Sequence, residues 1–401
     1  MAEFNEDAKN LVWDAVHTAP AVEVRVFARP GELMHPGVSG IDALLTAPET
    51  LAEFFRRRAM NAPAAPDPAA DASMKSLNPG ELADLVWRQL FLDHPPLSEA
   101  VRVVLTTLGL FGLDVGGGDL RLLREQYERI PPSERQGRAL SLANVDTVLY
   151  PVESMETADR DATGTGHPSF RPVLSLNRLL WDWKESARLL RRQGFGLKAR
   201  IDEFTPLELR RHLAAEAADL SPVALSLDWP AGHLPGDGGI GRLIREAALP
   251  LCRELGLAFM VASGDAEIAR LVPLWADHRE NRFLLFPGRA DQLEVAVAAA
   301  STARNLLLCG PDRPLAHPLV LEPFTGARLA MLGGMFHACH SGADVVEELA
   351  GSWAHMRWSL GKAFIRHYAD LWRTGWRFSE ADVGKDVRAV LGGNVRTFLG
   401  L

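Results

Sequence analysis

Short apolar runs recur along this chain and are separated by longer segments whose apolar residues have helical spacing. The first run, AVEVRVFA at Ala21–Ala28, is rich in valine and alternates in the way that strands do. Seven further runs follow: Thr147–Val152, Pro172–Asn177, Pro222–Trp229, Leu257–Ser263, Arg282–Pro287, Asn305–Gly310 and Met335–His340. Most of these runs are apolar throughout, which is typical of strands covered on both faces. The pattern therefore predicts eight strands that alternate with helices.

A long region without strand-like runs separates the first run from the second. Within residues 41–143, the segments ELADLVWRQLFL and LSEAVRVVLTTLGLFGLD are apolar at helical spacing, and a loop rich in proline and alanine lies at 61–72. We therefore predict three parts. An N-terminal helix and first strand occupy 1–40, a helical insertion occupies 41–143, and the remainder of the fold occupies 144–401.

Eight strands alternating with helices predict an α/β fold, namely a (β/α)8 TIM barrel with a helical insertion after strand 1. The competing fold is an open, doubly wound sheet. No GxGxxG motif follows any of the apolar runs, and GDGGIG at 236–241 begins a helix without a strand directly before it. These observations favour the barrel. In a barrel, the turns after the carboxyl ends of the strands usually carry the functional groups.

Composition and charge narrow the possible partners. With 47% hydrophobic and 23% charged residues, the chain has the composition of a globular protein rather than of a disordered one. A net charge of -8 argues against nucleic acid and against an anionic membrane as partners. No apolar run approaches the roughly 18–20 residues of a membrane-spanning helix. The N-terminal MAEFNEDAKN is acidic and polar, unlike a secretory signal.

The chain has only three cysteines, Cys252, Cys309 and Cys339, and no CxxC pair. A disulfide framework or a cysteine-rich zinc site is therefore not expected, and a reducing compartment is the natural environment. Together with the polar N-terminus, the low cysteine content predicts a cytoplasmic protein. We also expect the protein to form a homo-oligomer.

Several motifs are spread over nearly the whole chain. GIDALLT and LAEFFR occur within Gly40–Arg56, PVALSLDW ends at Trp229, HSGADV precedes a helix rich in tryptophan and arginine, and DVRAVLGGNVRTFLGL spans Asp386–Leu401. Together these stretches resemble the uronate isomerase (glucuronate isomerase) branch of the amidohydrolase superfamily. The resemblance implies a barrel that isomerises a hexuronate from aldose to ketose with a divalent metal, commonly zinc. It also implies a His-x-His pair after strand 1 and a His-Ser-Asp-x-Arg pattern after strand 8, in which Asp binds the metal and Arg binds the sugar acid.

The chain departs from both of these patterns. Residues 25–27, where the resemblance implies the histidine pair, read Arg-Val-Phe. Residues 340–344 read His-Ser-Gly-Ala-Asp, so Gly342 replaces the aspartate and Asp344 replaces the arginine. These changes remove side chains that a divalent ion requires as ligands. We therefore expect no metal and no other cofactor. The leading hypothesis is a diverged uronate isomerase-like barrel that is non-catalytic or binds a sugar acid.

The alternative hypothesis is a metal-dependent uronate isomerase, or a related amidohydrolase, with relocated ligands for zinc or another divalent metal. His337, Cys339 and His340 form the densest cluster of possible ligands. On a strand, alternation places His337 and Cys339 on one face and His340 on the other, so at most two of them converge. We favour the interpretation that His337 and Cys339 are packed interior residues.

The candidate catalytic residues are Asp228, which lies near the end of the fourth run, and His340. Isomerisation through an enediol needs a group that moves a proton between adjacent carbons, and Asp228 with Asp265 could form such an acid–base pair. Aspartate also caps helices well, and we favour this capping role for Asp265 and Asp312. The candidate substrate-binding residues are Arg29, His35, Arg171, Arg178 and Trp229. Arginine suits the carboxylate of a sugar acid because its planar guanidinium donates two parallel hydrogen bonds.

Overall fold

The computed structural model describes residues 6–27, 40–61, 77–155, 168–229 and 238–401. Its internal contacts divide the chain into two compact units. The sheet unit comprises Met1–Val26, Asp146–Gly342 and Met356–Leu401, and the helical unit comprises Phe27–Val145 and Ala343–His355. Helix α18 (Glu348–Arg373) begins in the helical unit and continues in the sheet unit.

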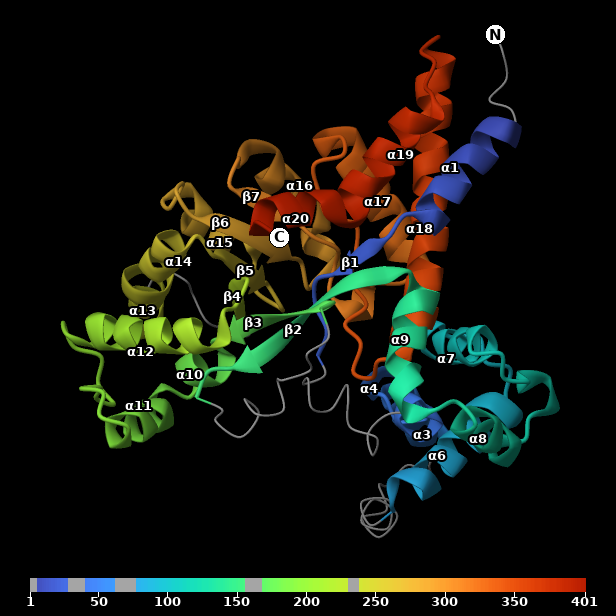
Figure 1. The fold of residues 1–401 in the computed structure, drawn as a ribbon, viewed down its shortest axis with the longest axis horizontal. Coiled ribbons are helices and arrows are strands. Elements are labelled where there is room, and N and C mark those ends of the chain that lie inside the picture. Colours follow the sequence, from blue (N-terminus) through green and yellow to red (C-terminus); the bar gives the residue numbers. More distant parts are fainter. Residues whose placement is uncertain (1–5, 28–39, 62–76, 156–167, 230–237) are drawn as a thin grey trace. The chain divides into compact units, whose positions relative to one another are not determined.

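Seven parallel strands form one curled sheet whose order follows the sequence. The strands are β1 (Ala21–Glu23), β2 (Val145–Glu153), β3 (Phe170–Ser175), β4 (Ala224–Asp228), β5 (Ala258–Ala262), β6 (Arg282–Phe286) and β7 (Leu306–Leu308). Figure 1 shows the sheet running from β1 in blue, through β2 and β3 in green, to β7 in orange. Because the strands are parallel, their carboxyl ends lie along one edge of the sheet. The first seven predicted strands are therefore confirmed.

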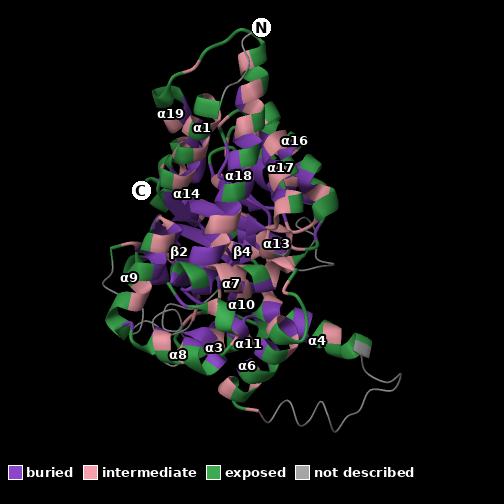
Figure 2. Ribbon diagram, turned by 90° about the vertical axis from the view of Figure 1, so that its right-hand side faces the viewer, coloured by how far each residue is buried: buried purple, intermediate pink, exposed green. Residues whose placement is uncertain are grey.

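Helices connect successive strands and pack against the sheet (Figure 1). In the sheet unit they are α1 (Glu6–Thr18), α10 (Asn177–Trp181), α11 (Trp183–Arg192), α12 (Thr205–Leu220), α13 (Gly239–Leu243), η3 (Ile244–Ala248), α14 (Leu249–Leu255), α15 (Ile268–Ala276), η4 (Ala290–Gln292), α16 (Leu293–Thr302), η5 (Arg313–Leu315), α17 (Pro318–Leu332), α19 (Glu380–Arg388), η6 (Ala389–Gly393) and α20 (Asn394–Leu399). Their sequences follow the helical period: α11 buries Trp183, Ala187 and Leu190, which share one helix face. Figure 2 shows the same contrast, with mostly buried strands and helices of mixed exposure.

None of the described helices is both long enough and apolar enough to cross a membrane.

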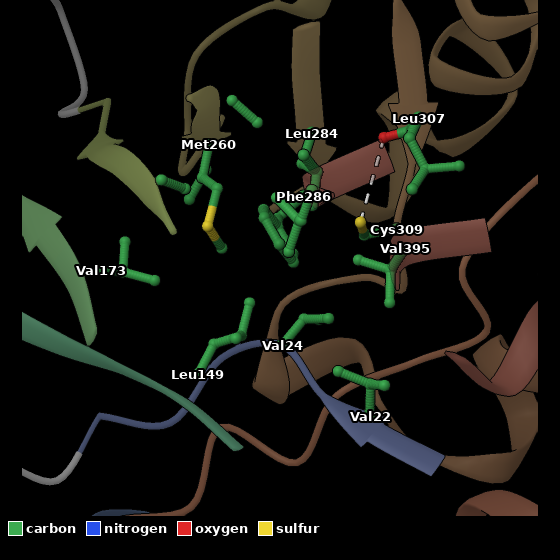
Figure 3. Packing of buried hydrophobic residues seen from close by; sticks show 14 residues of the cluster. Val22, Val24, Leu149, Val173, Met260, Leu284, Phe286, Leu307, Cys309 and Val395 are labelled. Atoms are coloured by element: carbon green, nitrogen blue, oxygen red, sulfur yellow. Dashed lines mark hydrogen bonds between the residues drawn. The ribbon is translucent and has the colours of Figure 1, made fainter. Parts of the chain in front are cut away.

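The inward-facing residues of all seven strands meet in one apolar core (Figure 3). This core also includes Val395 and Leu399 of α20. Helix α20 lies at the amino end of the sheet, because Arg396 pairs with Asp146 near the start of β2. The carboxyl ends of the strands lie at the opposite end. The strand residues in the core are Val22, Leu149, Val173, Ala224, Ala258, Met260, Ala262, Leu284, Phe286 and Leu307.

Apart from Val145, the first residue of β2, the regular elements among the described residues of the helical unit are helices. They are α3 (Ile41–Leu45), α4 (Pro48–Asn61), α6 (Pro79–Trp87), η1 (Arg88–Leu92), α7 (Glu99–Leu110), η2 (Val115–Gly117), α8 (Leu120–Glu128) and α9 (Pro132–Ala143). Arg124 of α8 joins three helices, since it donates to Asp42 and to Asp84, at 2.7 Å in each case. The buried hydroxyl of Tyr127 donates to Glu347, which ties the 343–355 segment to α8.

The predicted eighth strand is not confirmed, because Met335–His340 has no regular strand structure. The segment does lie beside β7, since the His337 amide donates to the Leu308 carbonyl oxygen at 2.9 Å. Its other backbone groups bond elsewhere. Arg328 donates to two of its carbonyl oxygens, both at 2.8 Å, and Asn394 donates to a third at 2.9 Å. Because side chains satisfy these carbonyl groups, a regular strand ladder does not form.

Gly310, just after β7, allows this segment to pass close to the strand. A Cβ atom on Gly310 would lie 2.4 Å from the Cα of Cys339, which is backbone and cannot rotate away. We predict that Gly310→Ala lowers the free energy of unfolding by about 1–3 kcal/mol, as overpacking does, when measured by urea denaturation. Gly334→Ala is the matched control, because a Cβ there meets no atom within 4 Å. Equal stability of the two variants would contradict the close packing.

Candidate functional site

Three charged side chains come together at the carboxyl ends of β4 and β7 and just after β1. Arg25 Nη1 donates to Asp228 Oδ1 at 2.9 Å, and Arg25 Nε lies 3.6 Å from Asp312 Oδ1. The side chains of Arg25 and Asp312 are only 12% and 15% exposed, whereas that of Asp228 is 45% exposed. The Phe286 ring faces the guanidinium at 5.5 Å. The site is thus a buried cation between two carboxylates, and it reaches solvent on the side of Asp228.

A fully buried carboxylate fixes the backbone at this point. Glu23 accepts hydrogen bonds from the Arg25 amide at 3.1 Å and from the Ser341 amide at 2.9 Å. The Gly342 amide donates in turn to the Arg25 carbonyl oxygen at 3.1 Å. Glu23 and Arg25 are charged residues in an otherwise apolar run, two positions apart and therefore on one face of a strand. That pattern is the sequence signal that could have placed both residues in the site.

Asp228 is held in place by Asn177, which sequence reasoning missed. Asn177 Nδ2 donates to Asp228 Oδ2 at 3.1 Å, and the Asp228 amide donates to Asn177 Oδ1 at 2.7 Å. Trp181 Nε1 also donates to the Asp228 carbonyl oxygen, at 2.9 Å. Asn177 is the polar residue that ends the apolar run PVLSLN. Asp228 is the polar residue near the end of the next run, PVALSLDW. Side chains at these two strand ends meet because neighbouring parallel strands end side by side.

Asp312 and Asp265 do not cap helices, contrary to the prediction. Asp312 precedes η5 and Glu267 precedes α15, with no side-chain capping hydrogen bond at either helix. Asp265 is exposed, whereas Asp312 is mostly buried and faces Arg25. Burial raises the pKa of Asp312 to about 6, although the Arg25 charge lowers it and the Asp228 charge raises it further. Asp312 is therefore part of this charged cluster and not a helix cap.

His340 borders the same cluster from the other side. Its ring is fully buried and lies edge-on to Phe286, with centroids 5.3 Å apart. His340 Nε2 is 4.0 Å from Asp312 Oδ1, and within the described residues neither ring nitrogen forms a hydrogen bond. Burial, and then the nearby Arg25 charge, lower the pKa of His340 well below its usual range, so the imidazole is neutral. The structure thus brings the two candidate catalytic residues, Asp228 and His340, to one cluster without direct contact.

The other proposed relocated ligands lie beside a second buried cation. Cys339 and His337 are fully buried, as expected of packed interior residues. Burial raises the pKa of the Cys339 thiol, and burial with the Arg328 charge lowers the pKa of His337 to about 3. Arg328 is fully buried between the Phe324 and Phe336 rings, 4.3 and 4.4 Å from their centroids. A metal ion at Cys339 and His337 would therefore have to displace the proton of the Cys339 thiol. It would also lie next to the positive charge of Arg328.

The residues at the family's metal-ligand positions do not fit a divalent ion. Arg25 is a cation, and Phe27, which is 40% exposed, has no donor atom. Gly342 has a φ of 60°, in the left-handed region, and its carbonyl oxygen accepts from Arg313 Nη1 at 2.8 Å. In the part of the chain that the structure describes, no group of three or more His, Cys, Asp or Glu side chains is arranged to hold a metal ion. The donor set that the resemblance implies is thus absent from these positions.

The two candidate arginines near the third strand lie at its opposite ends. Arg171 is exposed near the amino end of β3, which is the end opposite to the site. Arg178 is exposed in α10, at the carboxyl end, and its amide donates to Glu153 Oε2 at 3.3 Å. Glu153 also accepts from the buried Ser175 hydroxyl at 2.7 Å. Arg178 is therefore at the end of the sheet that carries the Arg25 cluster, and Arg171 is at the opposite end.

Of the remaining candidates, Trp229 lies in the described part of the chain, directly after β4. Trp229 is only 2% exposed and packs edge-on against Trp181, with ring centroids 5.7 Å apart. Arg29 and His35 lie outside the described residues. Trp229 therefore contacts Asp228 indirectly: it packs against Trp181, and the Trp181 indole donates to the Asp228 carbonyl oxygen.

A second buried polar cluster lies at the end of β2. The Ser154 hydroxyl donates to Glu216 Oε2 at 2.5 Å, and His212 Nε2 lies 3.2 Å from the same oxygen. Glu216 also accepts from the Met155 amide at 2.8 Å, where Met155 has a φ of 73°. Ser154 Oγ also lies 3.3 Å from His212 Nε2, the same ring nitrogen that faces Glu216. In a nucleophilic triad the serine and the acid contact different ring nitrogens, and the nucleophile is accessible, whereas Ser154 is fully buried. The cluster anchors a strained turn instead.

Comparison with known structures identifies the fold. A uronate isomerase from Bacillus halodurans C-125 matches with a TM-score of 0.91 and 25% sequence identity, over 100% of this chain and 98% of that one. A uronate isomerase from Thermotoga maritima has a TM-score of 0.72 and 10% identity, with 100% of both chains covered. A glucuronate isomerase from Caulobacter crescentus has a TM-score of 0.67 and 12% identity, over 98% and 93% of the two chains. No family model and no curated protein matches the sequence.

The class that these comparisons support is a parallel α/β fold shared with uronate isomerases. The chain is thus similar in fold to the uronate isomerases, as its motifs predicted. The likeness extends over the whole chain, so it includes the segments that surround Arg25 and His340.

The raised pKa of Asp312, about 6, predicts a defined pH dependence of stability. An unfolded aspartate has a pKa of about 3.9, so between about pH 4 and pH 6 the folded protein holds a proton that the unfolded chain has lost. The free energy of unfolding should therefore fall as the pH rises through this window, by at most about 3 kcal/mol, and change no further above it.

Urea denaturation of the wild type and of Asp312→Asn between pH 4 and pH 8 measures this effect. Asparagine does not titrate, so the difference between the two proteins isolates Asp312. Parallel pH profiles for the two proteins would show that Asp312 does not titrate in this window.

Proposed function

We propose that the chain is a complete (β/α)8 barrel in which residues 335–342 take the place of the eighth strand. Support comes from both neighbours of this segment. The His337 amide bonds to the Leu308 carbonyl oxygen of β7, and the Gly342 amide bonds to the Arg25 carbonyl oxygen after β1. Residues 41–143 then form a helical insertion after strand 1. In this arrangement Arg25, Asp228 and Asp312 lie at the functional end of the barrel.

The proposed function is metal-independent binding of a sugar acid of the hexuronate type, without isomerisation. The observation that carries this proposal is the pairing of Arg25 with Asp228 and Asp312. It places a permanent cation where the resemblance implies a metal-binding histidine. A guanidinium provides positive charge and directed N–H groups, but it has no open coordination position with which to act as a Lewis acid.

The groups around Arg25 suit a polyhydroxylated acid. The Asp228 carboxylate is accessible and accepts hydrogen bonds, as sugar hydroxyl groups require. Asn177 adds an amide, and the exposed Arg178 provides a guanidinium for a carboxylate. Arg25, in contrast, is paired with Asp228 and Asp312 and holds the Asp228 carboxylate in place. The ligand class itself rests on the likeness to the Bacillus halodurans protein, which is a uronate isomerase. Each of these side chains has a role in binding, and none is assigned a proton transfer.

Calorimetric titration with D-glucuronate and D-galacturonate tests the proposal. We predict that the wild type binds at least one of the two, and that Arg25→Lys weakens this binding about tenfold or more, because a point charge replaces a planar fork. Neither sugar acid should be converted to a ketose, with or without added zinc.

Arg171→Lys is the matched control for Arg25→Lys. It makes the same exchange on β3 at the opposite end of the sheet, so binding should remain unchanged. Turnover of a hexuronate by the wild type would replace the proposal with an enzymatic function. Absence of binding to every hexuronate would refute the ligand class.

The alternative, a metal-dependent isomerase or amidohydrolase with ligands at His337, Cys339 and His340, makes the opposite prediction. It requires about one zinc or manganese ion per chain and the loss of both metal and activity in His340→Ala. We expect elemental analysis of protein purified without an affinity tag to give no stoichiometric metal, because a buried protonated thiol and Arg328 oppose an ion there. Stoichiometric metal that disappears in His340→Ala would establish the alternative.

A cytoplasmic location and a homo-oligomeric state complete the proposal. Cys252, Cys309 and Cys339 are free thiols, and all three are buried. Free thiols support a reducing compartment. Light scattering of the purified protein tests the oligomeric state directly.

A further inference from the structure

The centre of the site contains the donor types of a metal site arranged around an organic cation. Asp228 and Asp312 come from the ends of β4 and β7, and both direct Oδ1 towards Arg25, at 2.9 Å from Nη1 and 3.6 Å from Nε. His340 adds an imidazole, with Nε2 4.0 Å from Asp312 Oδ1. Carboxylate oxygen and imidazole nitrogen are common ligands of divalent ions in proteins.

We propose that Arg25 is a resident cation: its guanidinium fills a latent divalent-metal site formed by Asp228, Asp312 and His340, and thereby excludes the ion. This inference deepens the proposed function, on which it rests, because it states what replaces the metal in a metal-independent site.

The charges of the cluster support this assignment. Two carboxylates that approach each other in a mostly buried place repel one another unless a cation lies between them. The Arg25 guanidinium fulfils that role, with its side chain 12% exposed and the Phe286 ring against it. A divalent ion that entered while Arg25 was present would meet a fixed positive charge within the same cluster.

His340 provides an independent observation. Its side chain is fully buried, and neither ring nitrogen forms a hydrogen bond in the described part of the chain. A buried polar nitrogen without a hydrogen-bond partner is unfavourable, so this imidazole is available as a ligand once the guanidinium is removed. The neutral imidazole has a lone pair to offer to a metal ion, and it points at the carboxylate that Arg25 holds.

The geometry also explains why no ready-made metal group exists in the described residues. The spacing of the two carboxylates is set by the guanidinium, at 2.9 and 3.6 Å, whereas a zinc–oxygen bond is about 2.0–2.2 Å long. The donors must close in when the guanidinium is removed. Asp228, with its exposed side chain, gives an ion access from solvent.

The test compares the wild type with Arg25→Gly, using zinc and manganese as probes and no sugar. We expect Arg25→Gly to bind about one ion per chain, about 100-fold or more tighter than the wild type. Calorimetry measures this affinity, and the electron paramagnetic resonance signal of manganese reports the bound ion. Guanidinium ion at low millimolar concentration should fill the vacated place and compete with the metal, whereas urea at the same concentration should not. The double variant Arg25→Gly/Asp312→Asn should lose the metal binding again.

Arg313→Gly is the matched control. Arg313 also carries a guanidinium near the cluster, but it donates to the Gly342 carbonyl oxygen, so its removal leaves Arg25 in place and should create no metal site. Equal metal affinity of the wild type and Arg25→Gly overturns the inference. If Arg25→Gly is unfolded in plain buffer, zinc or guanidinium should restore its thermal transition, and failure of both also overturns it. Because no sugar is present, a negative result here is distinct from a failure to bind hexuronates.

Discussion

The arrangement of the functional end depends on the burial of Arg25 between Asp228 and Asp312. Removing a charged group from water costs several kcal/mol, and the cost is offset only where an opposite charge and further hydrogen bonds compensate it. Here Asn177 holds Asp228, and Glu23 fixes the backbone that carries Arg25. Removing one partner of such a pair leaves an uncompensated buried charge, at a cost of about 3–5 kcal/mol. The cluster therefore fixes the positions of the carboxyl ends of β1, β4 and β7 relative to one another.

The same constraint reaches the segment where the eighth strand of a barrel would lie. Glu23 accepts a hydrogen bond from the Ser341 amide. Arg328 and Asn394 donate hydrogen bonds to the carbonyl oxygens of residues 336–338. Side chains therefore satisfy the backbone hydrogen-bonding groups that the strand ladder satisfies elsewhere in the sheet. This arrangement positions His340 beside Asp312 without regular secondary structure, and it depends on Gly310 for the close approach of the two chain segments.

The fold and the site give different kinds of information about function. The likeness to uronate isomerases extends over the whole chain and accounts for the positions of the strands. A shared barrel does not fix the chemistry, which resides in a few side chains at the strand ends. At the position where the resemblance implies a metal-binding histidine, this chain has Arg25, whose side chain is itself a cation. Binding of a sugar acid in such a site would not depend on the supply of metal.

The sequence by itself determined the strands, the helices and the place of Asp228, because apolar periodicity and strand-end position are local properties of the chain. It failed at Met335–His340, where distant side chains satisfy the backbone carbonyl groups. Sequence reasoning also assigned Asp312 to helix capping. It noted Arg25 only because a histidine was expected at that position, and gave Arg25 no role of its own. Arg25 and Asp228 are 203 positions apart in the chain, so only the curled sheet brings them together. Ion pairs between such distant residues leave no periodic signal, and the tertiary structure alone decided them.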